Sequence, residues 1–159
     1  MDMITIVSEA FNPGGKIPAE YTCVGQDKSP QLTWTGIPDK TASIALFMYD
    51  LDSPKLFVHW AIYNISPSIR GLPKGVPNTP TLTPWPFGNG TCQALNDFGK
   101  IGYGGPCPPP IKSHRYFFKI YALDKKLDTP PGTSHSRVSK DMEFSILATG
   151  ELAGTYGRW

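Results

Sequence analysis

The stretch GKIGYGGPCPPPIKSHRY, residues 99–116, leads from a loop rich in glycine and proline into the start of a strand. Glycine permits backbone conformations that other residues avoid, and proline stiffens the chain around it. The sequence HRYFFKIYAL, residues 114–123, alternates like a strand, in which successive side chains point to opposite faces. We therefore expect His114 and Tyr116 to lie on one face, beside the loop.

A second stretch, YDLDSPKLFVHW at residues 49–60, supplies further polar groups. Asp50 and Asp52 follow the apolar run SIALFMY, which predicts a strand buried on both faces. Aspartates in such a position either bond to the local turn or take donors from neighbouring side chains. For Asp50, His59 and Arg115 are the candidate donors.

Residues 57–65 predict the next strand, and its alternation indicates where His59 points. Three apolar residues, Val58, Trp60 and Ile62, fall on one face. His59 falls on the other, so we expect it to point away from the purest apolar face.

These aspartates, histidines and the tyrosine fit three kinds of site. A metal site with two histidines and one carboxylate would use His59, His114 and one aspartate. A hydrolytic triad would add Ser53 or Ser113, but the sequence has no GxSxG motif. The third kind is a small anion pocket, in which imidazole N–H and tyrosine O–H groups bind phosphate or carboxylate oxygens. We expect no catalytic residue, metal or cofactor, and we favour the anion pocket.

The loop glycines support this interpretation. In the run Gly102-Tyr103-Gly104-Gly105, successive amides can be directed at an anion. Its GxGG spacing does not match the GxGxxG pattern of dinucleotide sites. The amides of Gly104 and Gly105 are therefore candidate donors to a small anion.

Length and charge limit the class of protein. With 159 residues, the chain fits a single domain, 1–159. The net charge of +2 and the absence of a Lys/Arg run argue against nucleic acid as a partner. No apolar run approaches the roughly 20 residues of a membrane helix, and the N-terminal sequence lacks the pattern of a signal peptide. We therefore expect a cytoplasmic protein that is not an integral membrane protein.

The 16 glycines and 17 prolines leave little room for long helices. One helix is predicted from Ser134 or Ser136 to about Thr149, with Gly150 as its stop. Strands are predicted over residues 3–7, 31–35, 43–49, 57–65, 114–123 and 151–156, and only brief turns over 66–113. This pattern predicts a mainly β fold, an antiparallel sandwich of two sheets with one C-terminal helix and long loops.

The cysteines indicate no particular framework. Cys23, Cys92 and Cys107 are an odd number without CxxC spacing, so neither a zinc cage nor a set of disulfides is indicated. Whether any two of them pair is left open.

Several ordered motifs cover most of the chain: SPQLTW at 29–34, DxDxP at 50–54, NDFGKIGYGGPCPP at 96–109, HRYFFKIYALD at 114–124 and GTYGR at 154–158. In these motifs the chain resembles the phosphatidylethanolamine-binding proteins, specifically their prokaryotic Raf kinase inhibitor-like branch. The resemblance implies a Greek-key-like sandwich with a small surface cavity for phosphate-type anions or phospholipid head groups.

The resemblance also implies site residues. The family pocket maps onto Asp50, His59, Gly105, His114 and Tyr116, with Asp52 and Pro108 as neighbours. Cys107 lies between prolines and leaves less room than glycine would, which favours a small anion.

Partners are implied in the same way. Family members mostly bind rather than catalyse, and some are similar to inhibitors of kinases or serine peptidases. The alternative function is therefore inhibition of a serine peptidase through exposed loops such as residues 73–90. Members of the prokaryotic branch are often dimers, so a homodimer is also expected.

Overall fold

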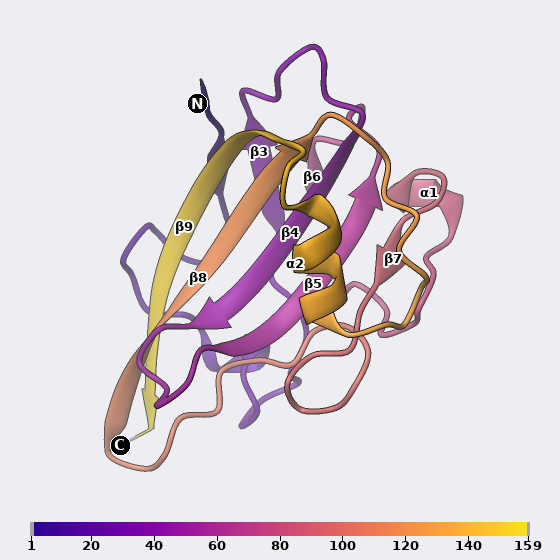
Figure 1. Ribbon diagram of the computed structural model, residues 1–159. Coiled ribbons are helices and arrows are strands. Elements are labelled where there is room, and N and C mark those ends of the chain that lie inside the picture. The colour runs from indigo at the N-terminus through magenta and orange to yellow at the C-terminus, as the bar shows by residue number, and fades with distance from the viewer. Residues whose placement is uncertain (1, 159) are drawn as a thin grey trace.

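The computed structural model describes residues 2–158, which form a mainly β domain (Figure 1). No helix within residues 2–158 has the length and hydropathy needed to cross a membrane. The strands are β1 (Asp2–Met3), β2 (Thr5–Val7), β3 (Leu32–Thr35), β4 (Ser43–Asp50), β5 (Phe57–Ile65), β6 (Gly71–Leu72), β7 (Cys92–Gln93), β8 (Lys112–Leu123) and β9 (Ile146–Arg158). The helical elements are the 3-10 turn η1 (Ala19–Tyr21), the single turn α1 (Pro84–Phe87) and the helix α2 (His135–Met142).

The strands form two sheets. The larger has six strands in the order β1-β9-β8-β4-β5-β7, and the smaller has three in the order β2-β3-β6. All pairs are antiparallel except β1 with β9. The small sheet lies behind the large one, and α2 lies in front of it over β4 and β5 (Figure 1). The predicted mainly β fold with two sheets is confirmed.

Each face of β4 belongs to a different part of the core. Ile44, Leu46 and Met48 pack with the cluster that joins the two sheets. Ala45 and Phe47 pack with the cluster that includes residues of α2. This explains why the strand is apolar almost throughout, as the sequence predicted.

A β-bulge in β5 changes the faces that simple alternation predicts. Met48 of β4 lies opposite Trp60, but the next residue of β4 lies opposite Val58, so His59 is an extra residue. Val58 therefore belongs to the cluster on the α2 side rather than to that of Trp60. His59 turns toward Tyr116, which belongs to the same cluster as Trp60, with 5.3 Å between the ring centroids. The prediction that His59 points away from this face is wrong, because it assumed a regular strand.

The predicted C-terminal helix is half as long as expected. It begins after Ser134, whose hydroxyl accepts a hydrogen bond from the amide of Arg137, and it ends at Met142. Ile146 continues the helical spacing of apolar residues but lies opposite Leu123 in the sheet. Gly150 is not a helix stop: a Cβ at this position would lie 2.0 Å from the carbonyl oxygen of Ile4, so the glycine permits close backbone approach.

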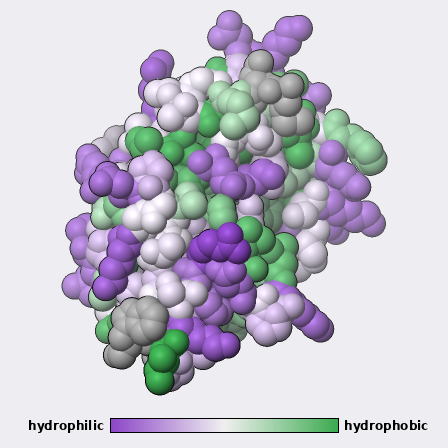
Figure 2. Space-filling model, turned by 90° about the vertical axis from the view of Figure 1, so that its left-hand side faces the viewer, coloured by the Kyte–Doolittle hydropathy of each residue, from purple (hydrophilic) through white to green (hydrophobic). Residues whose placement is uncertain are grey.

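Between residue 66 and the start of β8 at Lys112, the described chain contains only β6, α1 and β7, as its many glycines and prolines predicted. On the face shown in Figure 2, hydrophilic and hydrophobic residues are interspersed. Such a mixture is typical of the surface of a folded domain.

Candidate functional site

A cavity of about 210 Å³ lies at the end of the large sheet where β4 ends and β5 and β8 begin. The turn between β4 and β5 and the proline-rich loop before β8 enclose it. Its polar lining consists of Asp50, Ser53, His59, His114 and Tyr116. Its remaining walls are Pro54, Phe57, Phe98, Cys107, Pro108 and Pro109.

Strand register brings the polar residues together. Asp50, the last residue of β4, lies opposite Tyr116 of β8. His114 lies two residues away on the same face of β8, because side chains in a strand repeat with a period of two. The bulge in β5, the strand on the other side of β4 from β8, brings His59 into the same cavity. The predicted convergence of Asp50, His59, Pro108, His114 and Tyr116 on one cavity is therefore present in the structure.

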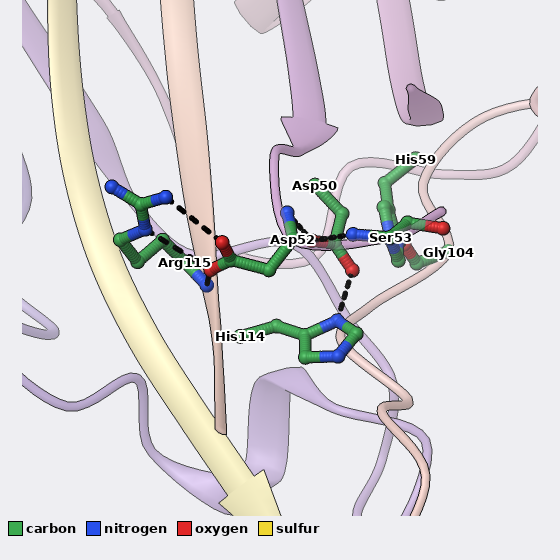
Figure 3. Close-up of polar contacts among 7 residues, drawn as sticks. All are labelled: Asp50, Asp52, Ser53, His59, Gly104, His114 and Arg115. Atoms are coloured by element: carbon green, nitrogen blue, oxygen red, sulfur yellow. Dashed lines mark hydrogen bonds and ion pairs between the residues drawn. The ribbon is translucent and has the colours of Figure 1, made fainter. Parts of the chain in front are cut away.

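Asp50 is held by donors on both of its carboxylate oxygens (Figure 3). Nδ1 of His114 donates to Oδ2 at 2.6 Å, and the amides of Asp52 and Ser53 donate to Oδ1 at 2.8 and 3.2 Å. Both side chains of the pair are buried. The carboxylate thus fixes the ring of His114 and directs its Nε2 away from the pair. The donors proposed from the sequence, His59 and Arg115, are not the ones used.

His59 is fixed by a backbone carbonyl. Its Nδ1 lies 2.6 Å from the carbonyl oxygen of Gly104, and since a carbonyl only accepts, Nδ1 carries the proton. Burial lowers the pKa of His59, and the carbonyl of Gly104 only partly opposes this effect. His59 is therefore a neutral ring at neutral pH, with Nε2 as its acceptor nitrogen.

Asp52 lies outside the cavity lining and pairs with Arg115. Two guanidinium nitrogens of Arg115 donate to the carboxylate at 2.8 and 3.0 Å, and the amide of Arg115 donates at 2.7 Å. The hydrogen bonds from Arg115 lower the pKa of Asp52 to about 2. This aspartate makes a surface ion pair just beyond the end of β4, beside β8, as Figure 3 shows.

The predicted glycine amides also lie outside the cavity lining. The amide of Gly104 donates to the carbonyl of His59 at 3.0 Å, and that of Gly105 donates to Oδ1 of Asp27 at 2.8 Å. A Cβ at Gly105 would lie 2.1 Å from the carbonyl oxygen of Tyr21, which requires glycine there. These glycines allow close approach of the Phe98 ring and of the backbone at Tyr21, and their amides are already bonded within the chain.

The aromatic wall was not predicted. Phe98 lies in the loop between β7 and β8, and its ring centroid is 4.8 Å from that of Phe57 and 5.2 Å from that of His59. Gly104 makes room for it, because a Cβ there would lie 2.5 Å from the Phe98 ring. The only sequence signal was its place within the motif at residues 96–109.

A disulfide joins Cys23 to Cys107, which lines the cavity. Cys92 is free and buried. The bond ties the proline-rich loop to the segment after η1. The sequence left open which cysteines pair, and the structure shows that Cys23 pairs with Cys107.

The two catalytic alternatives are not assembled in the structure. Ser113 is exposed, and Ser53 lines the cavity without a hydrogen bond between its hydroxyl and either imidazole in the described chain. Within residues 2–158, no three His, Cys, Asp or Glu side chains are arranged to hold a metal ion.

Comparison with known proteins identifies similar chains. The model of the family described as phosphatidylethanolamine-binding protein matches residues 7–157. A UPF0098 protein of Methanothermobacter thermautotrophicus is 44% identical over 156 residues, which cover 98% of this chain and 99% of the relative. A UPF0098 protein of Aquifex aeolicus is 41% identical over 159 residues, covering 98% of this chain and 90% of the relative.

Two solved structures share the fold over nearly their full length. The crystal structure of a phosphatidylethanolamine-binding protein homologue from Chlamydia trachomatis has a TM-score of 0.85 and 34% identity, and covers 100% of both chains. The crystal structure of Escherichia coli YbcL has a TM-score of 0.88 and 30% identity, and covers 98% of this chain and 99% of that chain. The match therefore includes the strands and loops that enclose the cavity.

Proposed function

Because this chain belongs to the phosphatidylethanolamine-binding protein family, we propose that it is a non-enzymatic binding protein whose cavity takes a phosphate-type anion or a phosphorylated head group. The observation that carries this proposal is the pair of buried imidazoles in one small cavity. Each ring uses Nδ1 for a protein acceptor, so Nε2 remains for a ligand.

The two rings have different roles in this proposal. His114 is bonded through Nδ1 to the Asp50 carboxylate, and in the imidazolium form of the ring the Nε2–H donates to an anionic oxygen of the ligand. His59 stays neutral because burial lowers its pKa, so its Nε2 accepts a hydrogen bond from a ligand hydroxyl. A phosphomonoester that retains one proton supplies both an anionic oxygen and a hydroxyl, and it does so near and below its second pKa of about 6.

The walls define the size and polarity of the ligand. A volume of about 210 Å³ is small beside the roughly 300–1,000 Å³ of pockets for drug-sized molecules. Proline and phenylalanine side chains face the part of the ligand that carries no charge. These features fit a head group better than a large metabolite.

The experiment is a titration with inorganic phosphate and, separately, with phosphoethanolamine, followed by NMR of the imidazole groups. The chain has three histidines, and His135 provides an internal control, because it lies outside the cavity lining and contacts Asp97. We expect shifts at His59 and His114 and none at His135. Equal response to both ligands would indicate that phosphate alone is recognised, whereas tighter binding of phosphoethanolamine would indicate a head group.

Variants make the test quantitative. His114→Gln should weaken binding, measured by calorimetry, by about 10- to 100-fold, the range for loss of a hydrogen bond to a charged group. His135→Gln should leave the affinity unchanged. If neither cavity histidine shifts at saturating ligand concentration, the proposal is wrong.

The expected alternative, a serine peptidase inhibitor, receives no support from the matched family or the relatives named above, whose descriptions do not mention peptidases. A kinase partner and a homodimer remain expectations from the resemblance.

A further inference from the structure

The disulfide between Cys23 and Cys107 lies between two neighbouring cavities. Cys107 lines the cavity proposed above to bind a phosphate-type anion, called the anion cavity below. Cys23 lines a cavity of about 410 Å³ beside it, and Phe98 lines both. The disulfide and the Phe98 ring therefore belong to the wall between the two cavities.

The bond lies at the surface of the molecule rather than in its core. Cys107 is exposed and Cys23 is half-buried. Neither cysteine belongs to the two clusters of buried residues that form the core of the described chain. A thiolate breaks a disulfide by attacking one of its sulfur atoms, so the reaction requires access to the bond. The position of this disulfide gives a dissolved thiol that access.

Hydrogen bonds hold the first part of the proline-rich loop independently of the sulfur atoms. The buried hydroxyl of Tyr103 donates to the carbonyl of Tyr21 at 2.6 Å. The amide of Cys23 donates to the carbonyl of Pro106 at 3.1 Å, and the amide of Gly105 is bonded as described above. Reduction of the disulfide removes none of these donors or acceptors. The chain up to Pro106 therefore keeps its anchors when the bond is broken.

The second part of the loop depends more strongly on the disulfide. Pro108 and Pro109 line the anion cavity, and as prolines they have no amide N–H with which to donate a hydrogen bond. Regular pairing of β8 with β9 begins at Lys112. The disulfide at Cys107 is thus an anchor for the chain between Pro106 and Lys112.

The same segment contains a strained residue. Ile111 has a φ angle of 63°, in the left-handed region that β-branched residues avoid. Such a conformation persists only where the surrounding structure imposes it. The side chain of Ile111 is 77% exposed, so the constraint comes from the backbone on either side, which is fixed at Cys107 and in β8. Because His114 follows three residues later, relaxation at Ile111 would move the start of the strand that positions His114.

We propose that this disulfide is a redox switch, and that its reduction by a dithiol lowers the affinity of the anion cavity for its ligand. One thiolate of the dithiol attacks a sulfur of the disulfide, and the cysteine sulfur that leaves takes up a proton. The second thiol of the dithiol then displaces the other cysteine, which is protonated in turn. Two electrons pass in this way from the dithiol, which becomes a disulfide, to Cys23 and Cys107. The switch rests on the proposed function, since it acts on binding of the same ligand.

Reduction and ligand binding are coupled in both directions. Without the bond, Ile111 relaxes, and Pro108, Pro109 and His114 shift relative to His59. A ligand that binds the oxidised protein more tightly must, by thermodynamic linkage, make the disulfide harder to reduce by the same factor.

The test compares calorimetric titrations with inorganic phosphate of the oxidised protein and of the protein held reduced by dithiothreitol. We expect phosphate to bind the reduced protein about 5- to 100-fold more weakly, the usual range of coupling between two sites. Reoxidation with oxidised glutathione should restore the affinity. In mixtures of reduced and oxidised glutathione, saturating phosphate should shift the equilibrium toward the disulfide by the same factor.

An NMR control shows whether the reduced protein stays folded. The indole N–H of the buried Trp34 donates to the carbonyl of Ile69, far from the disulfide in the core between the sheets. Its signal should be the same in the oxidised and the reduced protein. Loss of this signal on reduction would overturn the proposal, because the disulfide would then hold the whole fold rather than the cavity wall.

Three variants assign the effect. Cys92→Ala removes the free thiol and should keep the full response to dithiothreitol. Cys23→Ser with Cys107→Ser should bind phosphate as weakly as the reduced protein and should not respond. Ile111→Asn should keep the affinity of the oxidised protein and lose less of it on reduction, because asparagine tolerates the left-handed conformation. An unchanged loss in Ile111→Asn would overturn the role given to Ile111.

The outcomes separate this proposal from the proposed function. Equal phosphate affinity of the oxidised and the reduced protein would overturn the switch and leave the binding function intact. Absence of phosphate binding to the oxidised protein would overturn both.

Discussion

Asp50 and Asp52 are two residues apart in sequence, yet their surroundings give them separate roles. Asp50 is buried and accepts hydrogen bonds from His114 and from two backbone amides. Asp52 is partly exposed and forms its ion pair with Arg115 at the surface. Sequence alone did not separate them, because the difference arises from which residues of β8 lie opposite.

Removing these two carboxylates should therefore have unequal effects. Asp50→Ala leaves buried donors unpaired, so we expect the free energy of unfolding to fall by about 1–3 kcal/mol and phosphate binding to be lost. Asp52→Ala removes a surface ion pair, for which about 0–1 kcal/mol is typical. Urea unfolding and calorimetry of both variants measure this contrast. Equal losses of stability would contradict the assignment of Asp50 as the buried partner of His114.

His59 should make stability depend on pH. Because burial lowers its pKa in the folded state, the unfolded chain takes up a proton at higher pH than the folded chain does. The contribution of neutral His59 to the free energy of unfolding is therefore complete above about pH 6.5, which is the ordinary pKa of histidine. This contribution is lost progressively as the pH falls below that value.

The matched experiment compares the native chain with His59→Gln by urea unfolding at about pH 7.5 and 5.5. One proton taken up only by the unfolded state changes stability by about 1.4 kcal/mol per pH unit. Over this interval the His59→Gln variant should therefore lose less stability than the native chain, by at most about 1.4 kcal/mol. An identical acid loss in both proteins would show that His59 is not the group responsible.

At the scale of single elements, regular strands were predictable and irregular ones were not. The alternation of β8 correctly placed His114 and Tyr116 on one face because this strand is regular through the site. The direction of His59 was missed because a bulge depends on how β5 pairs with β4, which no local pattern reveals. The spacing of Ile146 suited a helix, but pairing with β8 drew it into β9.

The N-cap of α2 offers a prediction for that element. The hydroxyl of Ser134 accepts from the amide of Arg137, so Ser134→Ala should lower the free energy of unfolding by about 0.5–2 kcal/mol. Ser139→Ala is the matched control, because Ser139 is an exposed residue inside the helix and should change stability less. Thermal or urea unfolding of the two variants measures the difference. A larger loss of stability in Ser139→Ala would show that the Ser134 hydroxyl is not the cap.

At the scale of the whole molecule, the disulfide connects distant parts of the chain around the cavity. Cys23 and Cys107 are 84 residues apart in sequence, and Cys107 belongs to the cavity wall. A crosslink across a long loop restricts the unfolded chain, and losing a native disulfide typically costs about 2–5 kcal/mol.

A double variant, Cys23→Ser with Cys107→Ser, should therefore unfold at lower urea concentration and bind phosphate more weakly, since the proline-rich loop loses its tie. The control is the single variant Cys92→Ala, which retains the native disulfide. It should bind phosphate with unchanged affinity. Unchanged affinity in the double variant would show that the loop keeps its position without the bond.

The arrangement of β9 has a consequence for how the protein is made. β9 follows every other strand of the described chain, yet it pairs with β8 along the whole length of that strand, and β1 lies against its other edge. On the ribosome, β8 emerges with its aromatic side chains and one open edge before its partner has been synthesised. The strand that carries His114 and Tyr116 thus gains this neighbour only after β9 has been synthesised, and until then its open edge is a site at which another chain can pair.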